Sequence, residues 1–98
     1  MIFTSVTTAS PIQQKIIKRV SALMKLEEKG SLFHENDTYE DRATKTFVRR
    51  KKNHRATEYC FRFEEERNYY AWVYRKSQLA SPRQDFIELD DKYYVDIW

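Results

Sequence analysis

The sequence predicts an α+β domain in which one amphipathic helix packs on a four- to five-stranded antiparallel sheet. Apolar residues recur at helical spacing between residues 12 and 24, and beyond about residue 44 they alternate with polar residues, as in strands. Hydrophobic residues make up 41% of the 98-residue chain and aromatic residues 15%, which favours a folded core over disorder despite 34% charged residues. We therefore expect a single domain over residues 1–98.

The helix is predicted to begin after Ser10 and to end near Lys29. Ser10 suits the N-cap, Pro11 suits the first helical position, and Gln13 completes a capping box. Gly30, the only glycine, suits the left-handed position after the helix. Spacing gathers one apolar side, formed by Ile12, Ile16, Ile17, Val20, Leu23 and Met24. The opposite side carries a cationic ridge, formed by Lys15, Lys18, Lys25 and Lys29.

Strand-like composition marks five segments in the second half of the chain, separated by polar turns. They are residues 44–51, 57–64, 69–76, 85–89 and 93–98. A further short strand is expected at residues 1–6, before the helix. The element order that we expect for the four- to five-stranded sheet is β-α-β-β-β-β. Because the turns between neighbouring strands are short, we expect antiparallel hairpins arranged as a meander.

Residues 31–42 are predicted to form an exposed acidic loop, since residues 31–41 carry four carboxylates and no Lys or Arg. The single cysteine, Cys60, excludes an intramolecular disulfide and suits a reducing compartment, so we expect a cytoplasmic protein. No apolar run approaches the ~20 residues that a membrane-spanning helix needs. Residues 1–26 lack acidic residues and are basic and amphipathic, as organellar presequences are, although a core helix explains this stretch better.

The feature that indicates a binding surface most directly is the segment of residues 42–57. It carries seven of the eighteen Lys and Arg residues and no carboxylate. Within a basic hairpin at residues 44–64, these cations would meet the phosphates of DNA or RNA, because two-stranded ribbons fit the major groove. Alternation along a strand would place neighbouring cations on opposite faces. The candidate binding residues are Arg49, Arg50, Lys51, Lys52, His54 and Arg55, together with Lys15, Lys18 and Lys25 of the helix ridge. We expect a small regulatory protein that binds nucleic acid.

The alternative is a protein–protein adaptor or inhibitor, of the phage or plasmid accessory type, that uses a charged and aromatic surface. The aromatic side chains could stack on bases, anchor a protein partner, or fill the core. They are Tyr69, Tyr70, Trp72, Tyr74, Tyr93, Tyr94 and Trp98. A homodimer that pairs the C-terminal strand, residues 93–98, as a sheet edge is a further expectation.

Catalysis has less support. A small ribonuclease could use His54, Glu58, Arg62 and Glu64 of the hairpin, but the same spacing describes an ordinary charged strand. A nucleophilic pair of Cys60 and His54 is weaker, because a thiol in mid-strand usually acts as a small apolar group. Two histidines twenty residues apart give no zinc-ligand spacing, so we assign no metal site. We also assign no catalytic residue and no cofactor.

Overall fold

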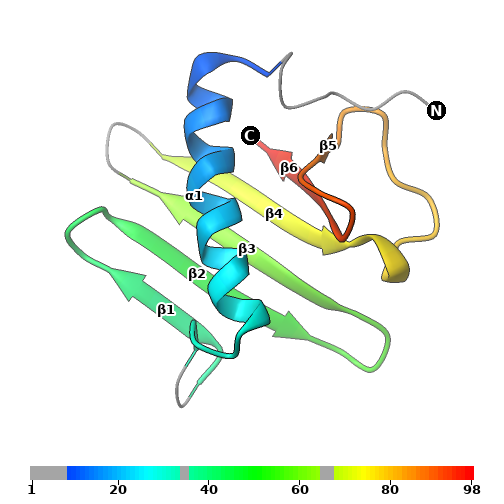
Figure 1. Cartoon of the computed structure of the whole chain (residues 1–98), viewed down its shortest axis with the longest axis horizontal. Coiled ribbons are helices and arrows are strands. Elements are labelled where there is room, and N and C mark those ends of the chain that lie inside the picture. Colours follow the sequence, from blue (N-terminus) through cyan, green and yellow to red (C-terminus); the bar gives the residue numbers. More distant parts are fainter. Residues whose placement is uncertain (1–8, 34–35, 65–67) are drawn as a thin grey trace.

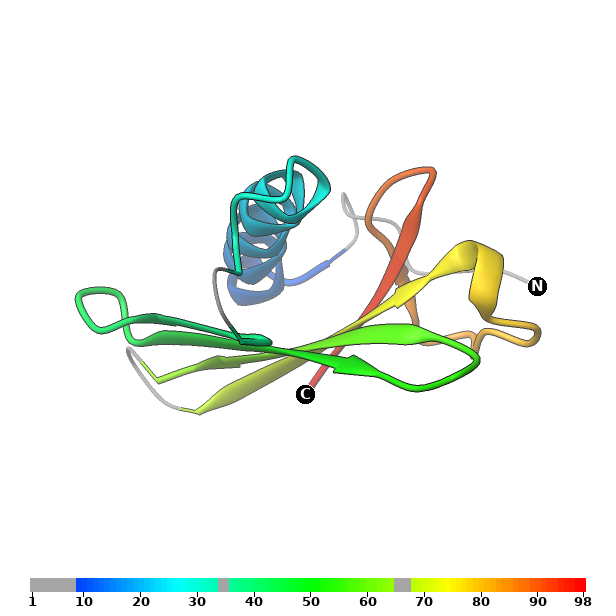
Figure 2. The same cartoon turned by 90° about the horizontal axis from the view of Figure 1, so that it is seen from below.

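The structure is a computed structural model that describes residues 9–33, 36–64 and 68–98. One α-helix lies across one face of a six-stranded antiparallel sheet, as Figures 1 and 2 show from two directions. The predicted α+β class is confirmed, with more strands than the four to five expected. The predicted strand at residues 1–6 lies outside the described residues. Within these ranges no helix combines the length and apolar character that crossing a membrane requires.

Helix α1 spans Pro11–Glu28, and both predicted ends are confirmed. The Ser10 hydroxyl accepts from the Gln13 N–H at 3.3 Å, and the Ser10 N–H donates to the Gln13 side-chain oxygen at 3.0 Å. At the other end, Gly30 adopts a positive φ of 72°. The N–H groups of Gly30 and Ser31 then close the last turn on the carbonyls of Glu27 and Leu26. Local sequence therefore fixes where this helix begins and ends.

The core lies between α1 and the sheet. The predicted apolar side of α1 buries Ile16, Ile17, Val20 and Met24, while Ile12 and Leu23 are partly buried. Every second residue of the central strands meets them. The fully buried strand residues include Tyr59, Phe61, Val73 and Val95. The helix therefore covers one face of the sheet.

The strands are ordered β1-β2-β3-β4-β6-β5, and every neighbouring pair is antiparallel. Their bounds are β1 Thr38–Asp41, β2 Thr46–Lys52, β3 Thr57–Phe63, β4 Tyr69–Arg75, β5 Ile87–Glu88 and β6 Tyr93–Ile97. A short 3-10 helix, Lys76–Gln78, follows β4. The five segments predicted after residue 43 correspond to β2 through β6.

Strand β1 lies inside the segment predicted to be an acidic loop at residues 31–42. Leu32 and Phe33 are buried, with 1% and 8% of their surface exposed, and residues 38–41 pair with β2. A tight turn makes this pairing possible, because the Asp41 carboxylate accepts the N–H groups of Ala43 and Thr44. The sequence does not indicate that β1 is a strand, because β1 contains Asp and Glu, which are depleted in strands.

The C-terminal strand is not the edge of the sheet, which corrects the prediction. Strand β6 pairs with β4 on one side and with the two-residue β5 on the other. The connection from β4 therefore passes over the place of β6 before β5 begins, and the meander is broken there. A homodimer built by pairing residues 93–98 as an edge would have to displace β5.

Candidate functional site

The face of the sheet that looks away from α1, here called the open face, is built from three rows of side chains that cross the strands. The first row comprises Lys51, Glu58, Tyr74, Tyr94 and Glu88. The second row comprises Thr38, Arg49, Cys60, Trp72 and Asp96. The third row comprises Glu40, Phe47, Arg62, Tyr70 and Trp98. Their strand neighbours point into the core, so alternation places all of these residues opposite the helix.

A continuous band of aromatic rings runs over β4 and β6 on the open face. The Trp98 ring stacks on Tyr70 and Trp72, with centroids 6.1 and 6.4 Å apart. The band continues from Trp72 to Tyr74 at 6.4 Å and from Tyr74 to Phe86 at 5.1 Å. Trp98 remains 57% exposed and Tyr70 40% exposed. Exposure is thus concentrated at the Tyr70–Trp98 end of the band, while Phe86 at the other end is buried, and a pair of large aromatic side chains left half in water marks a surface that can contact a partner.

Cations and an acid contact aromatic rings of the open face, both in this band and on β2. The Lys51 ammonium lies 4.9 Å from the centre of the Trp72 ring, and the Arg62 guanidinium lies 4.7 Å from that of Phe47. The Trp72 indole N–H donates to the Glu58 carboxylate at 3.3 Å. These contacts fix ring orientations before any partner arrives, which lowers the entropy cost of binding.

Charges of both signs are nearly balanced over the three rows. Three cations of the rows, Arg49, Lys51 and Arg62, stand against four carboxylates, and two further cations reach this face from outside the rows, Lys76 beside Glu88 and Arg83 beside Asp96. The carboxylates are Glu40, Glu58, Glu88 and Asp96. A surface of this kind differs from phosphate-binding surfaces, which are strongly positive.

Beside β6 the open face is hollowed around Asp96, in a depression of about 510 Å³ that Trp72, Tyr74 and Trp98 also line. Asp96 is 9% exposed and accepts from Arg83, which approaches from the loop after β4. Burial raises the pKa of Asp96 above its ordinary value, although the Arg83 charge opposes that shift. Burial, together with the nearby Asp85 carboxylate, thus outweighs the effect of Arg83 on the pKa of Asp96.

Cys60 lies at the centre of the second row and borders another depression of about 440 Å³. Burial raises the pKa of the Cys60 thiol, while Lys51 and Arg49 lower it less. A thiol with a raised pKa is a poor nucleophile, in agreement with the apolar role expected for it.

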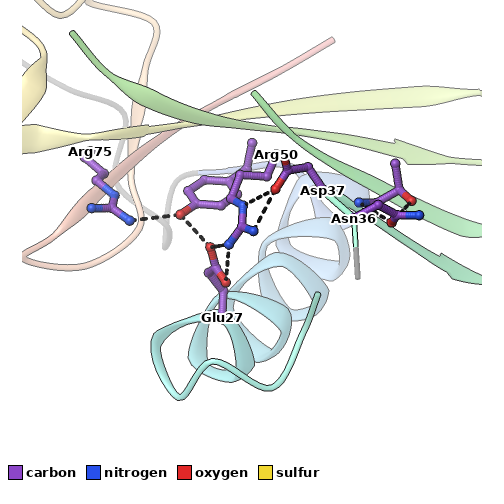
Figure 3. Close-up of polar contacts among 7 residues, drawn as sticks. Glu27, Asn36, Asp37, Arg50 and Arg75 are labelled. Carbon is purple, nitrogen blue, oxygen red and sulfur yellow. Dashed lines mark hydrogen bonds and ion pairs between the residues drawn. The ribbon is translucent and has the colours of Figure 1, made fainter. Parts of the chain in front are cut away.

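Arg50 does not belong to the basic surface predicted for it. It turns to the helix side, where its guanidinium donates to both oxygens of Glu27, at 3.3 and 3.0 Å, and to Asp37 at 2.8 Å (Figure 3). Tyr59 donates to the same Glu27 carboxylate at 2.8 Å and accepts from Arg75 at 3.0 Å. Burial alone would lower the pKa of Arg50, but these hydrogen bonds raise it above the ordinary value. Arg50 therefore joins the end of α1 to the sheet.

The remaining predicted binding residues fall on separate surfaces. Lys52, His54 and Arg55 are exposed at the tip of the β2–β3 hairpin, where the Asn53 side chain accepts the N–H groups of Arg55 and Ala56 at 2.8 and 2.9 Å. Arg49 and Lys51 stand on the open face. The exposed helix residues Lys15, Lys18 and Lys25 lie on the outer side of α1, in the opposite layer (Figure 2). The hairpin cations and the helix ridge thus do not share one face.

The residues considered for a ribonuclease are not gathered into a site. Glu58 and Arg62 stand in the first and third rows, roughly 13 Å apart along β3. Arg62 is instead paired with Glu64 at 2.9 Å. Across the described part of the chain, no cluster of His, Cys, Asp and Glu could hold a metal ion.

The continuity of the open face depends on strand register, which the sequence does not state. Alternation along β4 places Tyr70, Trp72 and Tyr74 on the same face of the strand. Only the pairing of β4 with β6 brings Trp98 beside them. No family model matches the chain, and neither the curated proteins nor the solved structures contain a significant match.

Proposed function

We propose that this protein is a protein–protein interaction module, an adaptor or inhibitor, and that the open face binds its partner. The observation that carries the proposal is the aromatic band over β4 and β6, whose exposed end is formed by Tyr70 and Trp98. Trp, Tyr and Arg are the residues that dominate binding energy at protein interfaces. The near balance of charges favours a protein partner, because a nucleic acid would meet four carboxylates among five cations, two of which, Lys76 and Arg83, are already paired with Glu88 and Asp96.

Site-specific cross-linking tests this proposal. A photo-reactive phenylalanine replaces Tyr70, which is 40% exposed and whose substitution leaves the core intact. In extract of the cells from which the sequence comes, we expect this variant to cross-link to one defined protein. That protein can be a second copy of this chain. The matched control carries the same group in place of Lys25, on the outer side of α1, and should give no such product. Equal cross-linking from both positions, or none from position 70, contradicts the proposal.

A second candidate function is nucleic-acid binding at the hairpin tip. Its support is that Lys52, His54 and Arg55 are exposed next to Arg49 and Lys51, with no carboxylate between residues 42 and 57. Cations at the tip of a ribbon can reach phosphates even where the rest of the sheet is charge-balanced.

Binding of labelled single-stranded DNA, RNA and duplex DNA, followed by fluorescence anisotropy, tests the second candidate. Affinity should fall steeply with salt, and replacing Arg49, Lys52 and Arg55 by Ala should reduce the salt slope by about one for each phosphate that the variant no longer binds. Arg50 is left unchanged, because its loss would destabilise the fold. Undetectable binding at low salt rules this candidate out.

A further inference from the structure

We propose that the depression beside β6 binds an arginine side chain of the protein partner, in exchange for this chain's own Arg83. The inference rests on the proposed function and deepens it, because it names a chemical group that the partner presents. It concerns the depression of about 510 Å³ that Trp72, Tyr74 and Trp98 line together with acidic residues.

The charges that line the depression are mostly negative. Its carboxylates are Glu58, Asp85 and Asp96, and Arg83 is the only cation among the described residues that line it. Arg83 donates to Asp96, and its Nε lies 3.7 Å from an Asp85 oxygen. The carboxylate that Arg83 leaves without a cation is therefore that of Glu58.

Glu58 is held by an indole group rather than by a charge. The Trp72 N–H donates to it at 3.3 Å, and it forms no ion pair with another residue that the structure describes. Lys51 lies directly opposite on β2, but its ammonium lies 4.9 Å from the centre of the Trp72 ring instead of on the carboxylate. Even when Lys51 is counted, three carboxylates face two cations. The excess negative charge favours the entry of one further cation.

The pKa of Tyr74 reflects the same excess. Burial raises this pKa most, Glu58 and Asp96 raise it further, and Arg83 lowers it. Because Glu58 has a larger effect than Arg83, the charges on balance disfavour another negative charge in the depression. An environment that disfavours an anion stabilises a cation.

Arg83 shows which kind of cation suits these surroundings. Its guanidinium donates to Asp96 while it lies 5.0 Å from the centre of the Phe86 ring. Trp98, two residues after Asp96 on the same face, offers a ring that is 57% exposed for the same pair of contacts. A guanidinium fits better than an ammonium, since its plane stacks on a ring while its N–H groups donate to a carboxylate.

Arg83 can leave Asp96 at little cost. Its side chain is 63% exposed, and it belongs to residues 79–86, which form neither helix nor strand. An ion pair with so exposed a partner contributes little to stability. After the exchange Arg83 keeps Asp85, which it already approaches, while the partner's guanidinium lies between Asp96 and the Trp98 ring.

Nuclear magnetic resonance of the tryptophans tests the inference. Trp72 and Trp98 are the only two tryptophans of the chain and both line the depression, so their indole N–H signals report on it directly. The probe is arginine blocked at both ends, and its control is blocked citrulline, which has the same shape without the charge. We expect saturable shifts of the indole signals with arginine and none with citrulline. Blocked lysine should bind more weakly than arginine.

Variants of the full chain should change the affinity for blocked arginine in opposite directions. Asp96→Asn should weaken binding about tenfold, because the carboxylate that accepts from the guanidinium is lost. Arg83→Gln should tighten binding about threefold, since the depression then has no internal competitor. The matched control is Glu40→Gln, which removes a carboxylate of the same face outside the depression and should leave binding unchanged.

Absence of arginine binding in both wild type and Arg83→Gln overturns the inference, and so does equally tight binding of citrulline or lysine. Unchanged or weaker binding in Arg83→Gln also contradicts it, because no exchange would then take place. If arginine does not bind while position 70 cross-links to one protein, the proposed function stands and the arginine site alone fails. Failure of both experiments removes both proposals.

Discussion

Two adjacent arginines, Arg49 and Arg50, have different roles because strand alternation sends them to opposite faces. Arg49 is exposed on the open face, whereas the Arg50 side chain is 21% exposed and pairs with a Glu27 side chain that is 9% exposed. The Arg50 guanidinium also lies 4.6 Å from the centre of the Phe33 ring. One position is free for binding and the other is part of the fold.

Arg50→Ala should lower the free energy of unfolding by about 2–4 kcal/mol, because it leaves the buried Glu27 charge without its cation. Arg49→Ala should change it by less than about 0.5 kcal/mol. Urea denaturation followed by circular dichroism measures both. Similar losses for the two variants would mean that the Glu27 cluster does not stabilise the fold.

Asp96 predicts a pH dependence of stability. Its pKa in the folded protein is raised above the ordinary 3.8, so the unfolded carboxyl ionises first as the pH rises. Wild type should therefore lose stability relative to Asp96→Asn between pH 3.8 and the folded pKa, and the difference should be constant above it. Urea denaturation of both proteins at about pH 3, 5 and 7 tests this sign. A difference that grows in favour of wild type with pH contradicts it.

At the scale of elements, the end of α1 is set by Gly30. Its φ of 72° lies in the left-handed region, and a Cβ added there would meet no atom within 4 Å. Any cost of substitution is therefore a cost of backbone conformation alone. The turn matters because Glu27, three residues earlier, holds Arg50 and Tyr59.

Gly30→Ala should lower the free energy of unfolding by about 1 kcal/mol, and Ser31→Ala, which keeps the same backbone, by clearly less. The urea midpoint should shift while the slope of the transition stays the same, since the surface exposed on unfolding is unchanged. A loss as large in Ser31→Ala would point to the side chains of the turn rather than to its dihedral angles.

At the scale of the whole molecule, helix and sheet share one core. Met24 from α1 is 2% exposed, and Val73 and Val95 from neighbouring strands are 0% exposed. Neither layer can bury its apolar side without the other. Unfolding should therefore be a single cooperative event.

Met24→Ala should lower the free energy of unfolding by about 2–5 kcal/mol, from reduced burial and the cavity left behind. The loss should appear with the same midpoint in far-ultraviolet circular dichroism, which reports the helix, and in fluorescence of Trp72 and Trp98, which report the sheet. Separate midpoints would show that the sheet persists without α1.

The sequence alone determined the parts of the fold that local chemistry controls. The capping residues around Ser10 and the glycine at position 30 placed α1, and alternation placed β2 through β6, because both depend on neighbours within a few residues. The acidic strand β1 was missed, since its pairing with β2 outweighs the low strand preference of its residues.

Tertiary structure decided the order of the strands and, with it, the candidate site. Only the insertion of β6 beside β4 brings Trp98 onto the aromatic band, and only the packing of α1 assigns Arg50 to Glu27 instead of to a ligand. These contacts join residues more than twenty positions apart. Their free energy comes from burial and pairing between elements, which no local pattern of residues contains.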